Sequence, residues 1–295
     1  MIAQVAASQS LVRDYVALTK PRIIVLLLFT ALGGMFLAAG GAPEVSLMLL
    51  VLGGGTLAAG GANALNQCLE GDIDEQMSRT RNRPVAVGRI RPRQAMVFGI
   101  GLNAIAFMVL ISYVNPLSAV LTLSATLFYV FVYTMGLKRT TPQNIVIGGA
   151  AGAIPPMVGW VAVTGHMGLP AVYLFSIVFL WTPPHFWALS LTLRDDYARA
   201  GIPMLPVVVG IYETKKSIML YALLVVALAL MFVATGSVGL IYLAAAAGLG
   251  MTFLYYAWRL FREPGINWAS GLFLYSIVYL ALLFLAIMVD SSVRL

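Results

Sequence analysis

One stretch of this chain combines an amide and three carboxylates with a spacing that suits metal chemistry. Residues 46–65 carry no charge, and Asn66, Glu70, Asp72 and Asp74 follow directly. Magnesium prefers oxygen ligands and commonly binds through a few carboxylates together with substrate phosphates. Asn66, Glu70 and Asp74 are spaced four apart, so a helix would place them on one side, with Asp72 pointing elsewhere. The spacing therefore favours a magnesium site.

A basic run follows these acids. It contains Arg79, Arg81, Arg83, Arg89, Arg91 and Arg93. Guanidinium groups bind phosphate oxygens with two parallel hydrogen bonds. Acids at the mouth of an apolar helix, followed by arginines, indicate a magnesium–diphosphate site at a membrane surface. Charged loops are also ordinary in membrane proteins, so this stretch alone leaves a solvated loop equally open.

A second acidic cluster repeats the arrangement. The apolar segment that ends near residue 193 is followed by Arg194, Asp195 and Asp196. If both clusters lie at the same end of one bundle, they would hold a diphosphate between them through metal ions. The pair of clusters is a stronger indication of a site than either cluster alone.

The composition places the elements that carry these clusters in a membrane. The chain has 295 residues, of which 61% are hydrophobic and 10% charged, with a mean hydropathy of +0.92, which excludes an ordinary soluble domain. A membrane span needs roughly 20 apolar residues. Nine segments qualify, at about 23–42, 46–66, 95–114, 117–137, 145–164, 171–193, 217–236, 239–257 and 269–289. We expect an all-α polytopic bundle of nine transmembrane helices that forms a single domain over residues 1–295, with residues 1–22 as a cytoplasmic tail.

The basic residues predict the orientation of this bundle. With the N-terminus in the cytoplasm, seventeen of the eighteen lysines and arginines fall on the cytoplasmic side, and Arg294 alone falls on the other. This bias matches the positive-inside rule. The net charge of +7 is therefore attributed to the orientation of the chain in the membrane. It would also attract anionic headgroups and an anionic substrate. Nucleic-acid binding has no support. Cys68 is the one cysteine, so no internal disulfide can form.

Several motifs together resemble the UbiA-type superfamily of intramembrane prenyltransferases, and within it the branch that acts on haem. The matching stretches are 18–22 (LTKPR), 66–74 (NQCLEGDID), 79–84 (RTRNRP), 137–144 (LKRTTPQN), 148–149 (GG), 181–187 (WTPPHFW), 195–197 (DDY) and 201–206 (GIPMLP). Glu70 takes the middle place of the superfamily's Asn-x3-Asp-x3-Asp motif. At the second motif, Tyr197 stands where many relatives have an acid, and Asp196 matches the Asp-Tyr pair of the haem branch.

The resemblance implies a reaction and a site. Farnesyl diphosphate, haem B and water would give haem O and diphosphate, with Mg²⁺ as cofactor. The catalytic residues would be Asn66, Glu70, Asp74 and Asp196, which hold the metal with Asp195 as a further ligand. The residues that meet diphosphate oxygens would be Arg79, Lys138, Arg139 and Arg194, each of which has headgroup anchoring as its alternative role. The protein would work in the lipid bilayer of a bacterial or mitochondrial inner membrane, with its site on the cytoplasmic or matrix side. Its product would pass to a downstream haem A synthase or terminal oxidase assembly.

His185 is the candidate haem contact. It lies inside the sixth apolar segment, after Pro183 and Pro184. Ionisable residues within spans usually face the protein interior, and imidazole is a common axial ligand of haem iron. The alternative is a core histidine bonded to a carbonyl that the prolines have freed. Tyr129 and Tyr133 either offer ring faces to a cation or pack in the core.

Three other functions stay open at this stage. A prenyltransferase for a quinone-precursor aromatic acceptor would need the acidic clusters but not His185. A secondary transporter would bind ions near the bilayer midplane, whereas these acids lie at the helix ends beside arginines. A haem-handling assembly factor without catalysis would share the haem contact, and only an assay distinguishes it.

Overall fold

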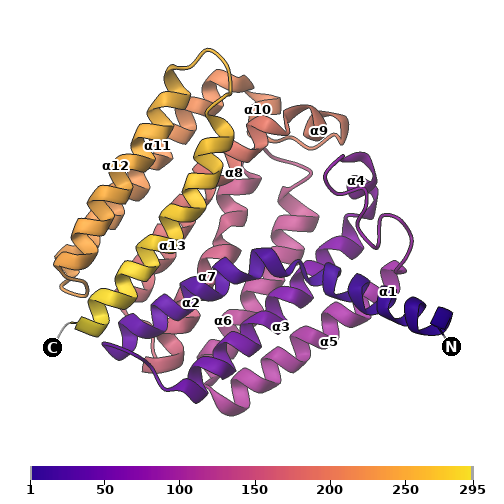
Figure 1. The fold of residues 1–295 in the computed structure, drawn as a ribbon, viewed down its shortest axis with the longest axis horizontal. Coiled ribbons are helices and arrows are strands. Elements are labelled where there is room, and N and C mark those ends of the chain that lie inside the picture. Colours follow the sequence, from indigo (N-terminus) through magenta and orange to yellow (C-terminus); the bar gives the residue numbers. More distant parts are fainter. Residues whose placement is uncertain (1, 294–295) are drawn as a thin grey trace.

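The computed structural model describes residues 2–293, which form helices joined by short turns and loops (Figure 1). The elements are α1 (Ile2–Thr19), α2 (Pro21–Ala39), α3 (Val45–Leu69), α4 (Gly71–Gln76), α5 (Pro92–Tyr113), α6 (Pro116–Leu127), η1 (Phe128–Leu137), α7 (Asn144–Thr164), α8 (Leu169–Thr192), α9 (Arg194–Arg199), α10 (Leu205–Val208), α11 (Gly210–Met231), η2 (Phe232–Thr235), α12 (Leu240–Arg262) and α13 (Ala269–Val293). The N-terminal segment expected as a tail is therefore largely helical.

Within the described residues, nine helices are long and apolar enough to cross a membrane, which confirms the predicted multi-pass architecture. The seventh span begins at Gly210 rather than near residue 217, because the helix continues through Glu213, Lys215 and Lys216 before it becomes apolar. The fourth span changes from α-helix to π-helix at Phe128. Hydropathy alone detects neither feature, since it reports apolar length and not hydrogen-bonding pattern.

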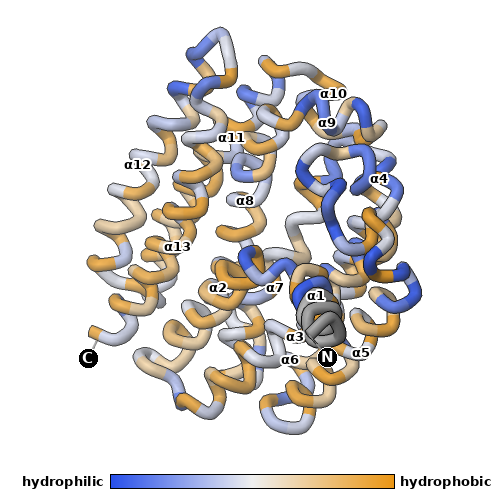
Figure 2. Tube along the Cα trace, turned by 45° about the vertical axis from the view of Figure 1, so that its right-hand side comes forward, coloured by the Kyte–Doolittle hydropathy of each residue, from blue (hydrophilic) through white to orange (hydrophobic). Residues whose placement is uncertain are grey.

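The two acidic clusters lie at the same end of the bundle. The short helices α4, α9 and α10 lie together there (Figure 1), and hydrophilic residues gather around α4 and α9 (Figure 2). The first cluster lies at the α3–α4 junction and the second lies in α9, directly after α8. Arg294, the one basic residue expected on the opposite side, lies outside the described residues.

Two glycines let α2 and α7 approach each other closely. A Cβ atom built on Gly159 of α7 would lie 1.9 Å from the carbonyl oxygen of Ala31 in α2, and one on Gly34 would lie 2.2 Å from the oxygen of Pro156. No side chain fits in either place. The backbones of α2 and α7 are therefore in direct contact, and this contact sets the spacing between two walls of the cavity described below.

Candidate functional site

Asn66, Glu70 and Asp74 gather at the end of α3, although no single helix carries them. The expectation of one continuous helix is wrong, because α3 ends at Leu69 and α4 begins at Gly71, with Glu70 as the shared cap. Helical spacing survives the break: the Glu70 amide donates to the Asn66 carbonyl at 3.0 Å, and the Asp74 amide donates to the Glu70 carbonyl at 2.8 Å. All three side chains are buried, whereas Asp72 is exposed, as predicted.

Both buried carboxylates have basic partners. The Lys138 ammonium donates to Glu70 Oε1 at 2.6 Å, and Glu70 is only 1% exposed. The Arg83 guanidinium donates to both oxygens of Asp74, at 2.8 and 2.9 Å. Buried carboxylates without compensation are costly, so these pairs account for the burial. Lys138 was predicted to lie in the site, whereas Arg83 was not singled out from the other arginines of its run.

Lys20 is a further site residue that the spacing argument missed. Its Nζ donates to Asn66 Oδ1 at 2.8 Å, while Asn66 Nδ2 donates to the Thr134 hydroxyl at 3.2 Å. Burial, reinforced by the Arg83 guanidinium, lowers the pKa of Lys20 to about 7. The one sequence signal was its place in the segment 18–22, directly before Pro21.

The backbone around Lys20 is held by amides of α3. Asn63 Nδ2 donates to the Thr19 carbonyl at 2.9 Å, and Gln67 Nε2 donates to the Leu18 carbonyl at 3.0 Å. Lys20 has φ +52°, and among the described residues no other non-glycine residue has a positive φ. This left-handed conformation is unfavourable for a side-chain-bearing residue. The α3 amides therefore hold a strained turn that directs Lys20 toward Asn66.

The second cluster meets the first through Asp196. Its carboxylate is buried and accepts hydrogen bonds from the Ser78 hydroxyl and from Arg199. Ser78 belongs to the loop that follows α4, so this contact joins the two acidic segments across more than a hundred residues of sequence. The adjacent Asp195 is exposed. Of the two predicted acids, Asp196 is the one that is buried and bonded to the loop after α4.

Three of the four predicted diphosphate-binding residues form no hydrogen bond to a buried carboxylate in the described part of the chain. Arg139 makes a two-point ion pair with Asp72, at 2.8 Å to each oxygen, on the exposed surface. That pair lowers the pKa of Asp72 and raises the pKa of Arg139. Arg194 Nε donates to the Pro206 carbonyl at 3.0 Å, and Arg79 is exposed. Among the four, Lys138 alone contacts a buried acid.

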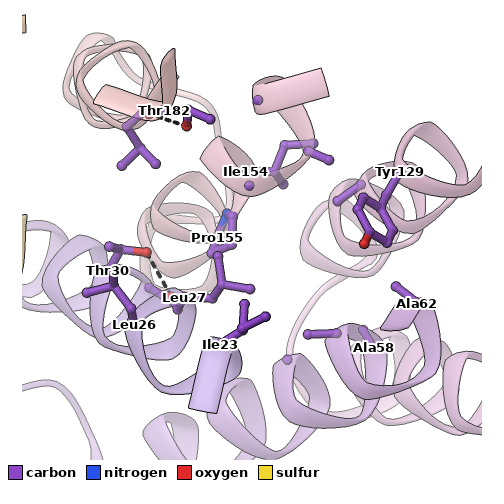
Figure 3. A pocket seen from close by; sticks show the side chains of 18 of the residues that line it. Ile23, Leu26, Leu27, Thr30, Ala58, Ala62, Tyr129, Ile154, Pro155 and Thr182 are labelled. Atoms are coloured by element: carbon purple, nitrogen blue, oxygen red, sulfur yellow. Dashed lines mark hydrogen bonds between the residues drawn. The ribbon is translucent and has the colours of Figure 1, made fainter. Parts of the chain in front are cut away.

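An apolar cavity of about 370 Å³ opens beside this cluster. Lys20 and Asn63 are among its lining residues, which places the cavity next to the buried acids. Figure 3 shows the Tyr129 ring extending into it, with Ile23 and Leu27 on the facing helix α2. Tyr129 and Tyr133 stack with their ring centres 5.6 Å apart, and both line the cavity. A cavity of this size is typical of small-molecule sites.

The oxygen donors fit magnesium, but they do not form a complete cage. Among the residues that the structure describes, no three His, Cys, Asp or Glu side chains converge closely enough to hold a metal ion. The donors are all hard oxygen atoms, from Asn66, Glu70, Asp74 and Asp196. Magnesium typically uses one or two carboxylates and completes its shell with water and substrate phosphates. The residues therefore suit a metal that binds together with a diphosphate.

His185 packs between α8 and α13. Its Nδ1 lies 2.7 Å from the Ser276 hydroxyl, and the rings of Trp181 and Phe273 stack on it with centre distances of 4.3 and 4.8 Å. The predicted alternative was a core histidine bonded to a carbonyl freed by the prolines, and the structure shows a packed histidine whose bond is to a serine hydroxyl of α13 instead. Trp181 and Phe186 both line the cavity, so His185 lies beside the cavity wall.

Residues 27–277 match the UbiA prenyltransferase family. The chain belongs to this family. It is similar to the protoheme IX farnesyltransferase of Symbiobacterium thermophilum, with 51% identity over 97% of this chain and 96% of that protein. The protein of the same name from Gloeobacter violaceus is also 51% identical, over 94% of this chain and 92% of its own length.

Solved structures confirm the UbiA fold. The chain superimposes on a structure of digeranylgeranylglyceryl phosphate synthase with a TM-score of 0.79 and 20% identity, covering 95% of this chain and 98% of the other. It superimposes on a UbiA homolog from Archaeoglobus fulgidus bound to GPP and Mg²⁺ with a TM-score of 0.64 and 15% identity, covering 94% and 99%. At these identities the likeness shows the fold alone.

Proposed function

We propose that this protein transfers the farnesyl group of farnesyl diphosphate to a vinyl group of haem B, with addition of water, to give haem O and diphosphate. The observation that carries the proposal is an apolar cavity beside a buried cluster of magnesium-type oxygen donors and cationic side chains. The two relatives at 51% identity, both called protoheme IX farnesyltransferase, support haem B as the acceptor.

The diphosphate would bind where the buried cations lie. Lys20, Arg83 and Lys138 each donate to an oxygen of the acidic cluster, and each would exchange that partner for a phosphate oxygen. Magnesium, when bound by Asn66, Glu70, Asp74 and Asp196, would neutralise the diphosphate and help it to leave. Groups placed where charge develops supply the largest share of most catalysis. The exposed Asp195 would be a peripheral ligand. Arg139 and Arg194 would exchange their present partners to reach the diphosphate, and Arg79 would bind it from the exposed edge of the site.

The cavity would hold the farnesyl chain. Breaking the allylic C–O bond sends the electron pair to diphosphate and leaves an allylic carbocation. The ring faces of Tyr129 and Tyr133, which line the cavity, attract cations. The vinyl π electrons of haem B then form the new C–C bond, water adds to the resulting cation, and a proton is released. An apolar lining keeps water from the first cation, which would otherwise be quenched to farnesol.

The reaction would face the cytoplasm of a bacterial inner membrane, or the matrix if the source is mitochondrial. The bias of basic residues toward the end that carries α4 and α9 supports this side. Haem O would then be available to a downstream haem A synthase or to terminal oxidase assembly.

Two adjacent acids give the test of this site. Asp74 is buried and paired with Arg83, whereas its neighbour Glu75 is exposed. In membranes supplied with haem B, farnesyl diphosphate and Mg²⁺, Asp74→Asn should reduce haem O formation at least a hundredfold, and Glu75→Gln should retain activity near the wild-type level. Equal activity of Asp74→Asn and wild type, at equal amounts of folded protein, would remove the assignment.

A further inference from the structure

His185 and Ser276 form a hydrogen bond between α8 and α13. The neighbouring atoms show which of the two residues donates and which accepts. Ser276 is fully buried, and its hydroxyl lies 2.6 Å from the Phe273 carbonyl oxygen and 2.7 Å from His185 Nδ1. A hydroxyl has one proton to donate. If that proton pointed at Nδ1, two oxygen atoms would face each other at 2.6 Å with no proton between them.

The serine proton therefore goes to the Phe273 carbonyl, and the serine oxygen accepts from Nδ1–H of the imidazole. In the neutral ring, a proton on Nδ1 leaves the lone pair on Nε2. Among the described residues, no protein group bonds to Nε2. The stacked rings of Trp181 and Phe273 fix the plane of the imidazole, so both its tautomer and its orientation are determined.

We infer that Ser276 is a positioning residue that keeps His185 in the Nδ1–H tautomer, so that Nε2 ligates the iron of the haem acceptor. Metal-binding histidines generally donate their second N–H to a fixed acceptor, which orients the ring and strengthens the ligand. Here that acceptor is a hydroxyl supplied by another helix. This inference rests on the proposed function, because it takes haem B as the acceptor.

The position relative to the cavity suits this role. Trp181, one helical turn before His185, lines the cavity and donates its indole N–H to the Ser276 carbonyl at 2.8 Å. Phe186, the next residue after His185, lines the cavity as well. His185 is thus flanked by cavity-lining residues of α8 without lining the cavity itself.

The test is a titration of the purified full-length protein with ferric haem B, followed by the Soret band. We expect an imidazole-ligated spectrum for wild type. Ser276→Ala removes the acceptor and lets the proton occupy either nitrogen, so haem affinity should fall 10- to 100-fold, the range for lost outer-sphere partners. In Ser276→Cys the sulfur is a weak acceptor, so its haem affinity should lie between those of wild type and Ser276→Ala. His185→Gln should lose the imidazole spectrum, and added free imidazole should restore it in His185→Ala.

Ser291→Ala is the matched control. Ser291 is buried on the same helix and donates to the Ile287 carbonyl at 2.8 Å, so its loss removes a comparable bond without touching His185. It should bind haem like wild type. Farnesyl diphosphate affinity should be unchanged in every variant named here.

The outcomes distinguish the proposed haem acceptor from the positioning role of Ser276. A wild-type protein that gives no Soret change overturns both the haem acceptor and the role of Ser276. A normal wild-type spectrum that persists in His185→Gln places the iron ligand elsewhere. A normal spectrum with equal haem affinity in wild type and Ser276→Ala removes the positioning role while leaving the proposed function intact.

Discussion

Replacing Gly159 by alanine should separate α2 from α7 and disturb the cavity between them. The added Cβ would lie 1.9 Å from the Ala31 carbonyl oxygen, about 1.5 Å short of the 3.4 Å at which ordinary contact begins. The obstacle is backbone, so no side-chain rotation relieves it. Overpacking of a tight interior costs about 1–3 kcal/mol, and we expect the upper end here.

Helix propensity opposes this cost. Alanine is favoured over glycine within a helix by up to about 1 kcal/mol, so the net destabilisation should be about 2 kcal/mol. For a large domain this lowers the melting temperature by roughly 4–8 °C. Because α2 carries Ile23, Leu27 and Thr30 into the cavity, we also expect weaker farnesyl diphosphate binding.

The assay compares thermal unfolding and haem O formation in detergent-purified variants. Gly248→Ala is the control, since a Cβ at Gly248 of α12 meets no atom within 4 Å; it should be as stable as wild type or slightly more so. If Gly159→Ala unfolds at the wild-type temperature with unchanged activity, the direct α2–α7 contact is not as close as described.

Further predictions address the charges, the turn, the metal and the orientation. Glu70→Gln leaves Lys138 without its buried partner and should cost about 3–5 kcal/mol of stability, measured by chemical unfolding, whereas an unchanged midpoint would contradict the buried ion pair. Asn63→Ala frees the Thr19 carbonyl, so the Michaelis constant for farnesyl diphosphate should rise several-fold; an unaltered constant would mean that the turn does not position Lys20. EDTA should stop haem O formation and Mg²⁺ should restore it, and turnover that continues in EDTA would rule out the metal. In a chain without Cys68, a cysteine at residue 82 should react with an impermeant thiol reagent from the cytoplasmic side and one at 167 from the other side; labelling of both from one side would refute the topology.

The spans were predictable because each is a long run of apolar residues. Within residues 2–293 nine such helices were found, and the seventh differs most from its expected bounds because it starts at Gly210. The gathering of Asn66, Glu70 and Asp74 on one side, with Asp72 turned away, was also predictable, since it follows from helical spacing. That spacing survived a helix break at Glu70 because the hydrogen bonds to residues four earlier continue across it.

The partners of these acids were not predictable in the same way. Lys20 contacts a residue 46 positions later, and Ser78 contacts one 118 positions later, so no local period reports either contact. Sequence offered six arginines after the first acids, and only the fold shows that Arg83 pairs with Asp74. Arg139 and Arg194 were candidates by proximity in sequence, yet their local geometry directs them to Asp72 and to the Pro206 carbonyl.

The central claim is farnesyl transfer to haem B with addition of water, and the mass of the pigment product tests it most directly. Purified protein in lipid nanodiscs would receive haem B, farnesyl diphosphate and Mg²⁺ in water labelled with heavy oxygen, with a hydroxybenzoate offered in parallel as a rival acceptor. We predict a haem product that has gained one farnesyl group and one labelled hydroxyl, with no prenylated hydroxybenzoate. Unchanged haem B together with farnesol or a prenylated hydroxybenzoate would contradict the account.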